Sequence, residues 1–172
     1  MAKILTDDFF HRDALEVAPE LVGKILVRTL DDGTELRERI TETEAYRGEE
    51  DKGCHAAKGR TKRTEVLYGE SGRIYVYLCY GVHWLMNVIT GEIDQPQGVL
   101  FRCGELHNGP GKLTKFLGVD GSFNGGSFCG NDRIRIEDDG FRPQLRTAPR
   151  VGIDYAGDYW KNVEWRFIAD RK

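Results

Sequence analysis

The turn sequence Asp31-Asp32-Gly33 lies between two strand-like segments, Lys24–Leu30 and Thr34–Tyr46. Short turns of Asp and Gly between β-prone segments are typical of β-hairpins, because Gly tolerates the positive φ that a tight turn requires. A hairpin imposes antiparallel pairing on its strands. The sequence from Lys24 to Tyr46 therefore restricts the chain to folds that contain an antiparallel sheet.

A second hairpin is predicted further along the chain, where Arg73–Tyr80 and His83–Thr90 flank Gly81. Both segments are rich in Tyr, Val, Ile and Trp, which are enriched in strands. Val99–Cys103 is another apolar strand, and two shorter strands are expected in the C-terminal third. These strands extend the predicted sheet well beyond the first hairpin.

Two helices are predicted beside the strands. Asp13 can cap a helix that stops at Gly23, and Pro110 begins another that stops at Gly118. The 172 residues contain no linker or repeat, and they suffice for one filled core but not comfortably for two. We predict a single α+β domain over residues 1–172, with a curved, mainly antiparallel β-sheet, flanking helices and a protruding β-hairpin.

Three of the four acidic side chains in the strand that ends at Tyr46 are expected on one face. Strand alternation places Glu38, Glu42, Glu44 and Tyr46 on one face, together with apolar neighbours such as Ile40. Either this face is solvated, or some carboxylates line a pocket in which their charge is used. From this run alone, the solvated face is the favoured interpretation.

The segment 47–72 is polar and rich in Gly, which predicts a long functional loop with a helical turn near 62–68. Within it, Lys58–Arg63 carries four positive charges in six residues. Such runs are usually solvated, and phosphate contact is the alternative. The net charge of −3 argues against an extended basic surface for nucleic acid.

Tyr80 is expected at or beside the tip of the second hairpin, next to Gly81. A large ring at an exposed turn is unusual, because its burial normally contributes a few kcal/mol. Tyr80 either folds back over the sheet or acts as a wedge between base pairs. Asn87 is a polar residue among apolar ones, so it is either a satisfied buried amide or a functional group.

The cysteines at 54, 79, 103 and 129 form no Cys-x-x-Cys pair, which fits reduced thiols and argues against a zinc ribbon. The N-terminus lacks a hydrophobic signal segment, and no apolar run is long enough to span a bilayer. We expect a protein without metal or cofactor, located in the cytoplasm with the nucleoid in a bacterium or in the nucleus of a eukaryote.

Several motifs occur in the order seen in one known family. They are Glu-Thr-Glu-Ala-Tyr (42–46), His55, Arg-Thr-x-Arg (60–63), Tyr-Val-Tyr-x-x-Tyr-Gly (75–81), Met-Asn (86–87), Leu-Phe-Arg (100–102), Gly-Pro-Gly-Lys-Leu (109–113) and Arg-Val-Gly-Ile-Asp-Tyr-Ala-Gly (150–157). Over about residues 6–168 the chain resembles the alkyladenine (3-methyladenine) DNA glycosylase family. The resemblance implies a monofunctional glycosylase of base excision repair, which excises alkylated or deaminated purines from duplex DNA.

The resemblance also implies a role for each matching residue. Glu44 matches the general base that activates water, and Arg102 matches a residue near the target nucleotide and this water. The extruded base would be contacted by Tyr46 and His55, and Asn87 would crowd a guanine amino group. Tyr80 matches the side chain that fills the vacated stack.

The expected partner is double-stranded DNA with damaged purines, bound by a monomer without membrane association. We expect a positive strip along the DNA backbone, made by Arg60, Lys62, Arg63 and Lys112. The start of the helix at Pro110 would add backbone donors to a phosphate.

The chemistry of such a site follows from the leaving group. A purine alkylated at N3 or N7 is cationic and leaves readily, so the enzyme mainly needs a carboxylate to activate water and stabilise oxocarbenium-like charge. Hypoxanthine must be protonated as it departs, so activity on 3-methyladenine is favoured over activity on hypoxanthine. No lysine closely follows Glu44, so lyase chemistry is not expected.

Two other functions are compatible with the same residues. A non-catalytic nucleic-acid-binding module would use the basic loop and the aromatic hairpin, but would gain nothing from a carboxylate facing DNA. A metal-dependent phosphodiester hydrolase would use Glu42, Glu44, Asp51 and His55 as ligands. Their spacing matches no strong metal motif.

Overall fold

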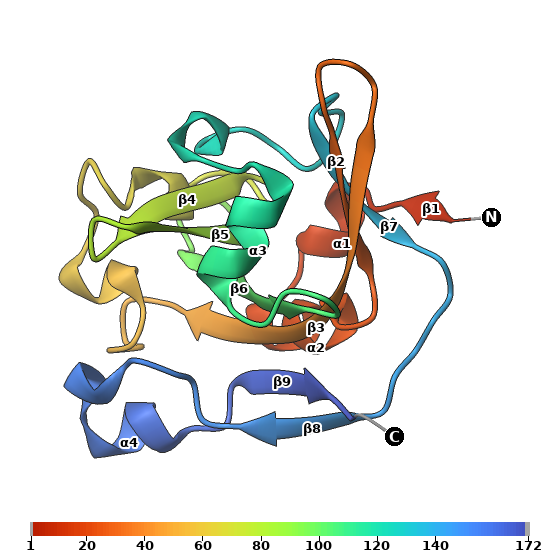
Figure 1. Cartoon of the computed structure of the whole chain (residues 1–172). Helices are drawn as coiled ribbons and strands as arrows, with labels where there is room; N and C mark the ends of the chain where they lie inside the picture. The colour runs from red at the N-terminus through yellow and green to blue at the C-terminus, as the bar shows by residue number, and fades with distance from the viewer. Residues whose placement is uncertain (1, 171–172) are drawn as a thin grey trace.

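Both predicted hairpins form, and their strands join one nine-stranded sheet in the computed structural model, which describes residues 2–170 (Figure 1). The strands are β1 (Lys3–Ile4), β2 (Ile25–Thr29), β3 (Glu35–Arg47), β4 (Ile74–Cys79), β5 (His83–Ile89), β6 (Gln97–Gly104), β7 (Ile134–Asp138), β8 (Leu145–Ala148) and β9 (Arg166–Ala169). The order is β1-β7-β2-β3-β6-β5-β4, and the β8–β9 ribbon joins through β9 to β3. Each strand pairing is antiparallel, as predicted.

The helices are short. The α-helices are α1 (Asp7–Phe10), α2 (Ala14–Leu21), α3 (Pro110–Leu117) and α4 (Gly157–Asn162), and the 3-10 turns are η1 (His55–Lys58), η2 (Glu65–Tyr68), η3 (Gly121–Phe123) and η4 (Asp154–Ala156). The caps at Asp13 and Gly118 are confirmed, because the Asp13 side chain accepts the Leu15 N–H and Gly118 ends α3 in the left-handed region. Helix α2 ends at Leu21 with Val22, and not the predicted Gly23, as its C-cap. The α+β prediction is therefore confirmed.

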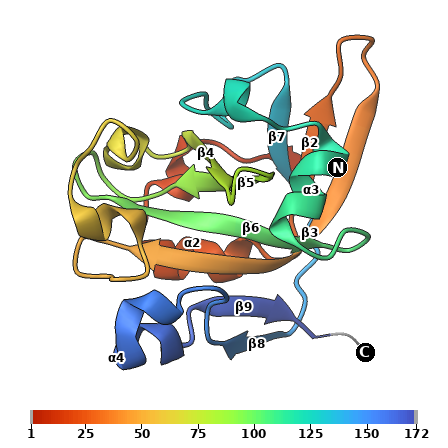
Figure 2. The ribbon, with the colours of Figure 1, turned by 60° about the vertical axis from the view of Figure 1, so that its left-hand side comes forward.

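The long strand β3 pairs with three other strands and so joins the parts of the sheet. Its first half pairs with β2, and its second half pairs with β6 on one edge and with β9 on the other. Helix α2 packs on one face, where the Thr43 hydroxyl donates to the Ala18 carbonyl at 2.7 Å. Helix α3 begins at the opposite face, where a Cβ at Gly111 would lie 2.9 Å from the His83 ring (Figure 2).

The interpretation of the acidic face of β3 as solvated is wrong for two of its carboxylates. Glu38 and Glu44 are both buried, with 2% and 0% of their surface exposed. Glu38 accepts the Leu106 N–H at 2.7 Å and contacts His107 Nδ1 at 2.5 Å. Burial of these charges is tolerated because each carboxylate has polar partners.

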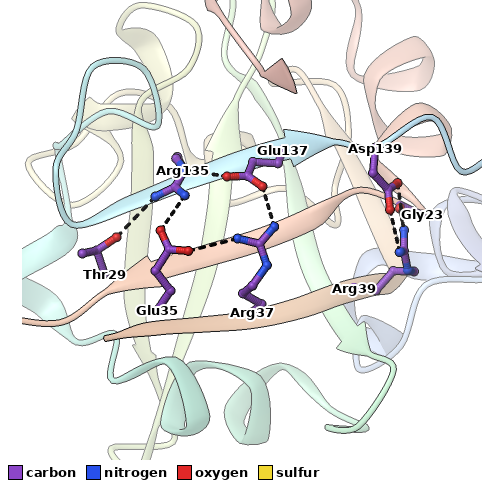
Figure 3. A network of polar contacts seen from close by, with 8 residues as sticks. All are labelled: Gly23, Thr29, Glu35, Arg37, Arg39, Arg135, Glu137 and Asp139. Carbon is purple, nitrogen blue, oxygen red and sulfur yellow. Dashed lines mark hydrogen bonds and ion pairs between the residues drawn. The ribbon is translucent and has the colours of Figure 1, made fainter. Parts of the chain in front are cut away.

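A second polar surface lies at the far end of the sheet, across β2, β3 and β7 (Figure 3). Arg37 and Arg135 alternate with Glu35 and Glu137, and each arginine pairs with both carboxylates. This closed ring of four charges, here called the charge ring, is neutral overall. It links β3 to β7 through side chains across the intervening strand β2.

Candidate active site

A cavity of about 500 Å³ opens on the face of the sheet that carries Glu44. Its floor includes one cross-strand row, since Glu44 on β3 pairs with Leu100 on β6, Leu100 with Asn87 on β5, and Asn87 with Tyr75 on β4. Directly paired residues project from the same face. The sheet register therefore assembles a single site from residues more than forty positions apart.

The Glu44 carboxylate is fixed by two hydrogen bonds. Tyr46 donates its hydroxyl to Oε1 at 2.8 Å, and the Val151 backbone N–H donates to Oε2 at 2.7 Å. Arg102 Nε lies 3.9 Å from Oε2. Burial raises the pKa of Glu44 above its ordinary value, and the charge of Arg102 and the Val151 N–H offset part of that rise. A raised pKa makes this carboxylate, when ionised, a stronger base than an exposed glutamate.

His55 forms another wall of the cavity. Its Nδ1 shares a hydrogen bond of 2.9 Å with the Tyr75 hydroxyl, and its ring lies 4.5 Å from the Tyr77 ring centroid. Burial, with smaller contributions from Arg63 and Lys58, lowers the pKa of His55 to about 4. The imidazole is therefore neutral at physiological pH.

The structure also places the two remaining residues of the predicted pocket. Arg102 and Asn87 both line the cavity. Asn87 is buried, and its Nδ2 donates to the Tyr75 carbonyl at 3.1 Å. The amide is thus both satisfied and positioned at the cavity, so the two alternatives from the sequence do not exclude each other.

Tyr80 lies in the turn between β4 and β5, which is on the left in Figure 1 near the long 48–72 segment. Its surface is 91% exposed, and its φ of 52° is unusual for a residue other than Gly. The alternative in which this ring folds back over the sheet is wrong. Because Tyr80 also lines the rim of the cavity, the exposed ring stands directly beside the site.

The predicted basic residues fall into two groups. Arg60 pairs with Glu65 at 2.6 Å and Asp94 at 2.8 Å, so much of its charge is compensated within the protein. Lys62 and Arg63 are exposed, and Lys112 is exposed at the start of α3 and lines the cavity rim.

The suggested metal ligands do not converge. Asp51 pairs with Arg150 at 2.7 Å, while Glu44 and His55 bond to Tyr46 and Tyr75. Within residues 2–170, no group of three or more His, Cys, Asp or Glu side chains is arranged to hold a metal ion. No helix in this range is long and apolar enough to cross a membrane.

Sequence reasoning missed the contribution of the segment after β8. Val151 supplies the N–H to Glu44, and Arg150 donates to the Ala45 carbonyl at 2.9 Å and to Asp51 at 2.7 and 2.8 Å. The motif Arg150–Gly157 was the available signal, but nothing in it indicates a partner about 100 residues earlier in the chain.

A cavity of this size, with an ionisable floor and an exposed aromatic ring at its rim, suits the recognition of one extruded base. Comparison with known proteins places this protein in the class of DNA glycosylases, which are DNA-repair hydrolases. A family model described as methylpurine-DNA glycosylase matches residues 8–108 and 104–172. The chain belongs to the methylpurine-DNA glycosylase family.

Individual relatives agree with the family match. A protein of Natranaerobius thermophilus is 43% identical in an alignment that covers 93% of this chain and 92% of the relative. A protein of Desulfitobacterium hafniense is 42% identical, covering 98% of this chain and 96% of the relative. Both carry the name "Putative 3-methyladenine DNA glycosylase".

Proposed function

We propose that this protein is a monofunctional DNA glycosylase that hydrolyses the N-glycosidic bond of 3-methyladenine and 7-methylguanine in duplex DNA, and more slowly that of hypoxanthine. It acts as a monomer on an extruded nucleotide and leaves an abasic site for base excision repair. The observation that carries the proposal is the buried Glu44 carboxylate in the floor of the cavity, with each oxygen held by a hydrogen bond.

The proposed reaction uses Glu44 as the general base. Glu44 takes a proton from a water molecule, whose oxygen forms a bond to C1′ while the bond from C1′ to the base nitrogen breaks. The electron pair of that bond leaves with the base, and the carboxylate stabilises the oxocarbenium-like charge. Arg102, at 3.9 Å from Glu44, keeps a positive charge beside the carboxylate and favours its ionised form.

The walls of the cavity would select the base. Tyr46, His55 and Tyr77 offer ring surfaces for stacking, and Asn87 would crowd the amino group of an undamaged guanine. A neutral His55 adds no positive charge against an alkylated base. Hypoxanthine leaves more slowly in this proposal, because the site offers no evident acid to protonate it.

Extrusion would depend on the β4–β5 turn and the basic residues around it. Unstacking a base costs a few kcal/mol, and Tyr80 in the vacated stack would offset about 1–3 kcal/mol of that cost. Lys62, Arg63 and Lys112 would contact phosphates. Arg60 would contribute less, because Glu65 and Asp94 already pair with it.

The proposal is tested by incubating the protein with duplexes that carry 3-methyladenine, 7-methylguanine, hypoxanthine or ethenoadenine, followed by alkaline cleavage at abasic sites. We expect cleavage of the strands with alkylated bases, and single-turnover excision of 3-methyladenine ahead of hypoxanthine. Faster removal of hypoxanthine would reverse the proposed order, and absence of abasic sites in all duplexes would contradict the proposed activity.

A second assay tests the monofunctional mechanism. Lys112 lines the cavity rim and is the amine to examine for Schiff-base chemistry. We expect borohydride to trap no covalent complex with lesion DNA. A trapped complex that disappears in Lys112→Ala would show lyase-type chemistry and contradict this part of the proposal.

A further inference from the structure

Arg150 lies behind the aromatic wall of the cavity. Its side chain is 0% exposed, and its guanidinium carbon lies 4.7 Å from the centroid of the Tyr46 ring and 5.1 Å from that of Trp165. Tyr46 lines the cavity, whereas Arg150 is enclosed on the protein side of that ring. One side of the Tyr46 ring is thus already in contact with a cation.

The position of this cation is fixed. Asp51 receives hydrogen bonds from Nη1 and Nη2 of Arg150 at 2.7 and 2.8 Å, and the Ala45 carbonyl receives a third at 2.9 Å. Asp51 also accepts the backbone N–H groups of Arg47 and Gly53. Because the strand on both sides of Tyr46 is tied to the same ion pair, the guanidinium cannot leave the ring without disrupting the site.

A cation on one side of an aromatic ring weakens attraction for a second cation on the other side. The attraction arises from the negative potential of the π face, which the first cation partly neutralises, and the two positive charges repel each other. A second wall has a similar arrangement, since the guanidinium carbon of Arg63 lies 5.7 Å from the centroid of the Tyr77 ring. A neutral base stacked on these rings is not subject to this repulsion.

We infer that Arg150 determines the charge selectivity of the cavity: its guanidinium on the buried side of Tyr46 suppresses the advantage of cationic bases, so that neutral modified purines bind nearly as well. The inference rests on the proposed function and deepens it, because it concerns which lesions the same cavity accepts. Arg150 acts through Tyr46 and is a positioning and specificity residue, not a catalytic one.

The test measures affinity without turnover, in protein carrying Glu44→Gln. Dissociation constants are determined for matched duplexes with 7-methylguanine, which is cationic, and hypoxanthine, which is neutral. Replacing the ion pair by Arg150→Met with Asp51→Asn leaves no unpaired buried charge. We expect this change to shift the affinity ratio toward 7-methylguanine by about threefold or more. A ratio unchanged within experimental error would overturn the inference.

The matched control is a second ion pair beside the site. Arg166 pairs with Glu42 at 3.2 Å and lies opposite Glu44 in the pairing of β9 with β3. Within residues 2–170, its guanidinium lies over no aromatic ring. Arg166→Met with Glu42→Gln should leave the affinity ratio unchanged. An equal shift in this control would assign the effect to general electrostatics and overturn a role for the Tyr46 ring.

A further measurement requires no change at Arg150 and serves if that variant fails to fold. With the native ion pair present, the Glu44→Gln protein should bind 7-methylguanine less than about threefold more tightly than its neutral isostere 7-methyl-7-deazaguanine, which carries the same amino group. A preference above tenfold would overturn the inference. Failure of the proposed function looks different, because both lesion duplexes would then bind no better than undamaged DNA.

Discussion

Three carboxylates of β3 lie within seven residues of each other, and their surroundings separate their roles. Glu38 is engaged by His107 and the Leu106 N–H, and Glu42 pairs with Arg166. Glu44 alone of the three lines the cavity, where its two oxygens keep fixed orientations. All three are glutamates of one strand, so partners from other elements decide which one faces the cavity.

The pH dependence of excision should report the ionisation of Glu44. Burial raises the pKa of this group in the folded protein, and the general base must be ionised. The rate should therefore rise with pH through a midpoint above the ordinary value of 4.5, and fall about tenfold for each pH unit below that midpoint. This rise is measured by single-turnover rates of 7-methylguanine excision over a range of pH values.

Two comparisons make the assignment specific. Glu42→Gln should leave the midpoint in place, because Glu42 lies outside the cavity lining. His55, with its pKa lowered to about 4, should add no transition near pH 6.5. The role proposed for Glu44 would be contradicted if the midpoint of the rate–pH curve moved in the Glu42 variant, or if the rise of rate with pH disappeared on replacing His55.

The sequence predicts contacts between residues that are close along the chain, but not contacts between residues that are far apart in it. Glu44 and Tyr46 are two apart on a strand, so alternation places them side by side, and the structure shows them hydrogen-bonded. Val151 and Arg150 reach the same site from more than 100 positions away. Backbone donors and buried ion pairs of this kind carry no periodic signal in the sequence.

The β4–β5 hairpin carries Tyr80 at a point where the ring packs against little of the protein. Tyr80→Ala should leave the free energy of unfolding within about 0.5 kcal/mol, because the side chain is exposed. Loss of stacking worth about 1–3 kcal/mol should weaken lesion binding by about fivefold or more. Urea unfolding and fluorescence anisotropy with lesion DNA measure the two effects.

Val82 provides the control for this hairpin, since it is 69% exposed in the same turn but lacks a flat ring. Val82→Ala should have a much smaller effect on binding. If Tyr80→Ala binds lesion DNA as tightly as the unaltered protein, the ring does not occupy the vacated stack.

The charge ring across β2, β3 and β7 should stabilise the fold in a pH-dependent way (Figure 3). Burial acts to raise the pKa of Glu137, but hydrogen bonds from Arg37 and Arg135 outweigh it and hold that pKa below its usual range. The contribution is thus complete above the unfolded value of about 4.5 and is lost as pH falls through the lower folded pKa. Glu137→Gln should cost about 1 kcal/mol at pH 7 and less at pH 3.

Chemical unfolding of Glu137→Gln at the two pH values measures this difference. Glu35→Gln is the matched control, because the Glu35 side chain is 39% exposed in the same ring and solvent screens it more strongly. It should cost less than Glu137→Gln does at pH 7. An equal cost for Glu137→Gln at both pH values would contradict the linkage.

The elements missed by sequence reasoning are those without an apolar period. Strand β8 is almost wholly exposed, and α4 buries no residue, so neither has the alternation or stripe that identifies a strand or helix. By contrast, α2 buries Ala14, Val17, Ala18 and Leu21 along one side, and Pro110 and Gly118 bound α3. Helices and strands are predicted correctly where buried residues recur at a regular spacing or where capping residues mark their ends. They are missed where only pairing with another strand, as for β8 with β9, or contacts with loops hold them in place.

For the whole molecule, the net charge of −3 means that DNA binding depends on local positive charge. Lys62→Ala with Arg63→Ala should reduce the slope of log affinity against log salt concentration by about 2, because each lost phosphate contact contributes about 0.9. Arg60→Ala is the control and should change the slope less, since Glu65 and Asp94 already pair with that residue. An unchanged slope in the double variant would show that the segment 58–63 does not contact DNA phosphates.

Assembly of the site depends on distant parts of the chain, because its floor joins β3, β6, β5 and β4 and the loop after β8 supplies the Val151 N–H to Glu44. Glu44 is the one carboxylate proposed to activate water. Glu44→Gln keeps the shape of the side chain and removes its basicity, so binding and chemistry can be measured separately. A pure DNA-binding module would bind as well or better after the same change.

The most direct measurement is single-turnover excision of 7-methylguanine by Glu44→Gln, alongside its affinity for the same duplex. We predict that lesion binding stays within about threefold of the unaltered protein, while excision falls by at least about a hundredfold, in line with the loss of a general base. Excision at the unaltered rate with intact binding would contradict the assignment of Glu44.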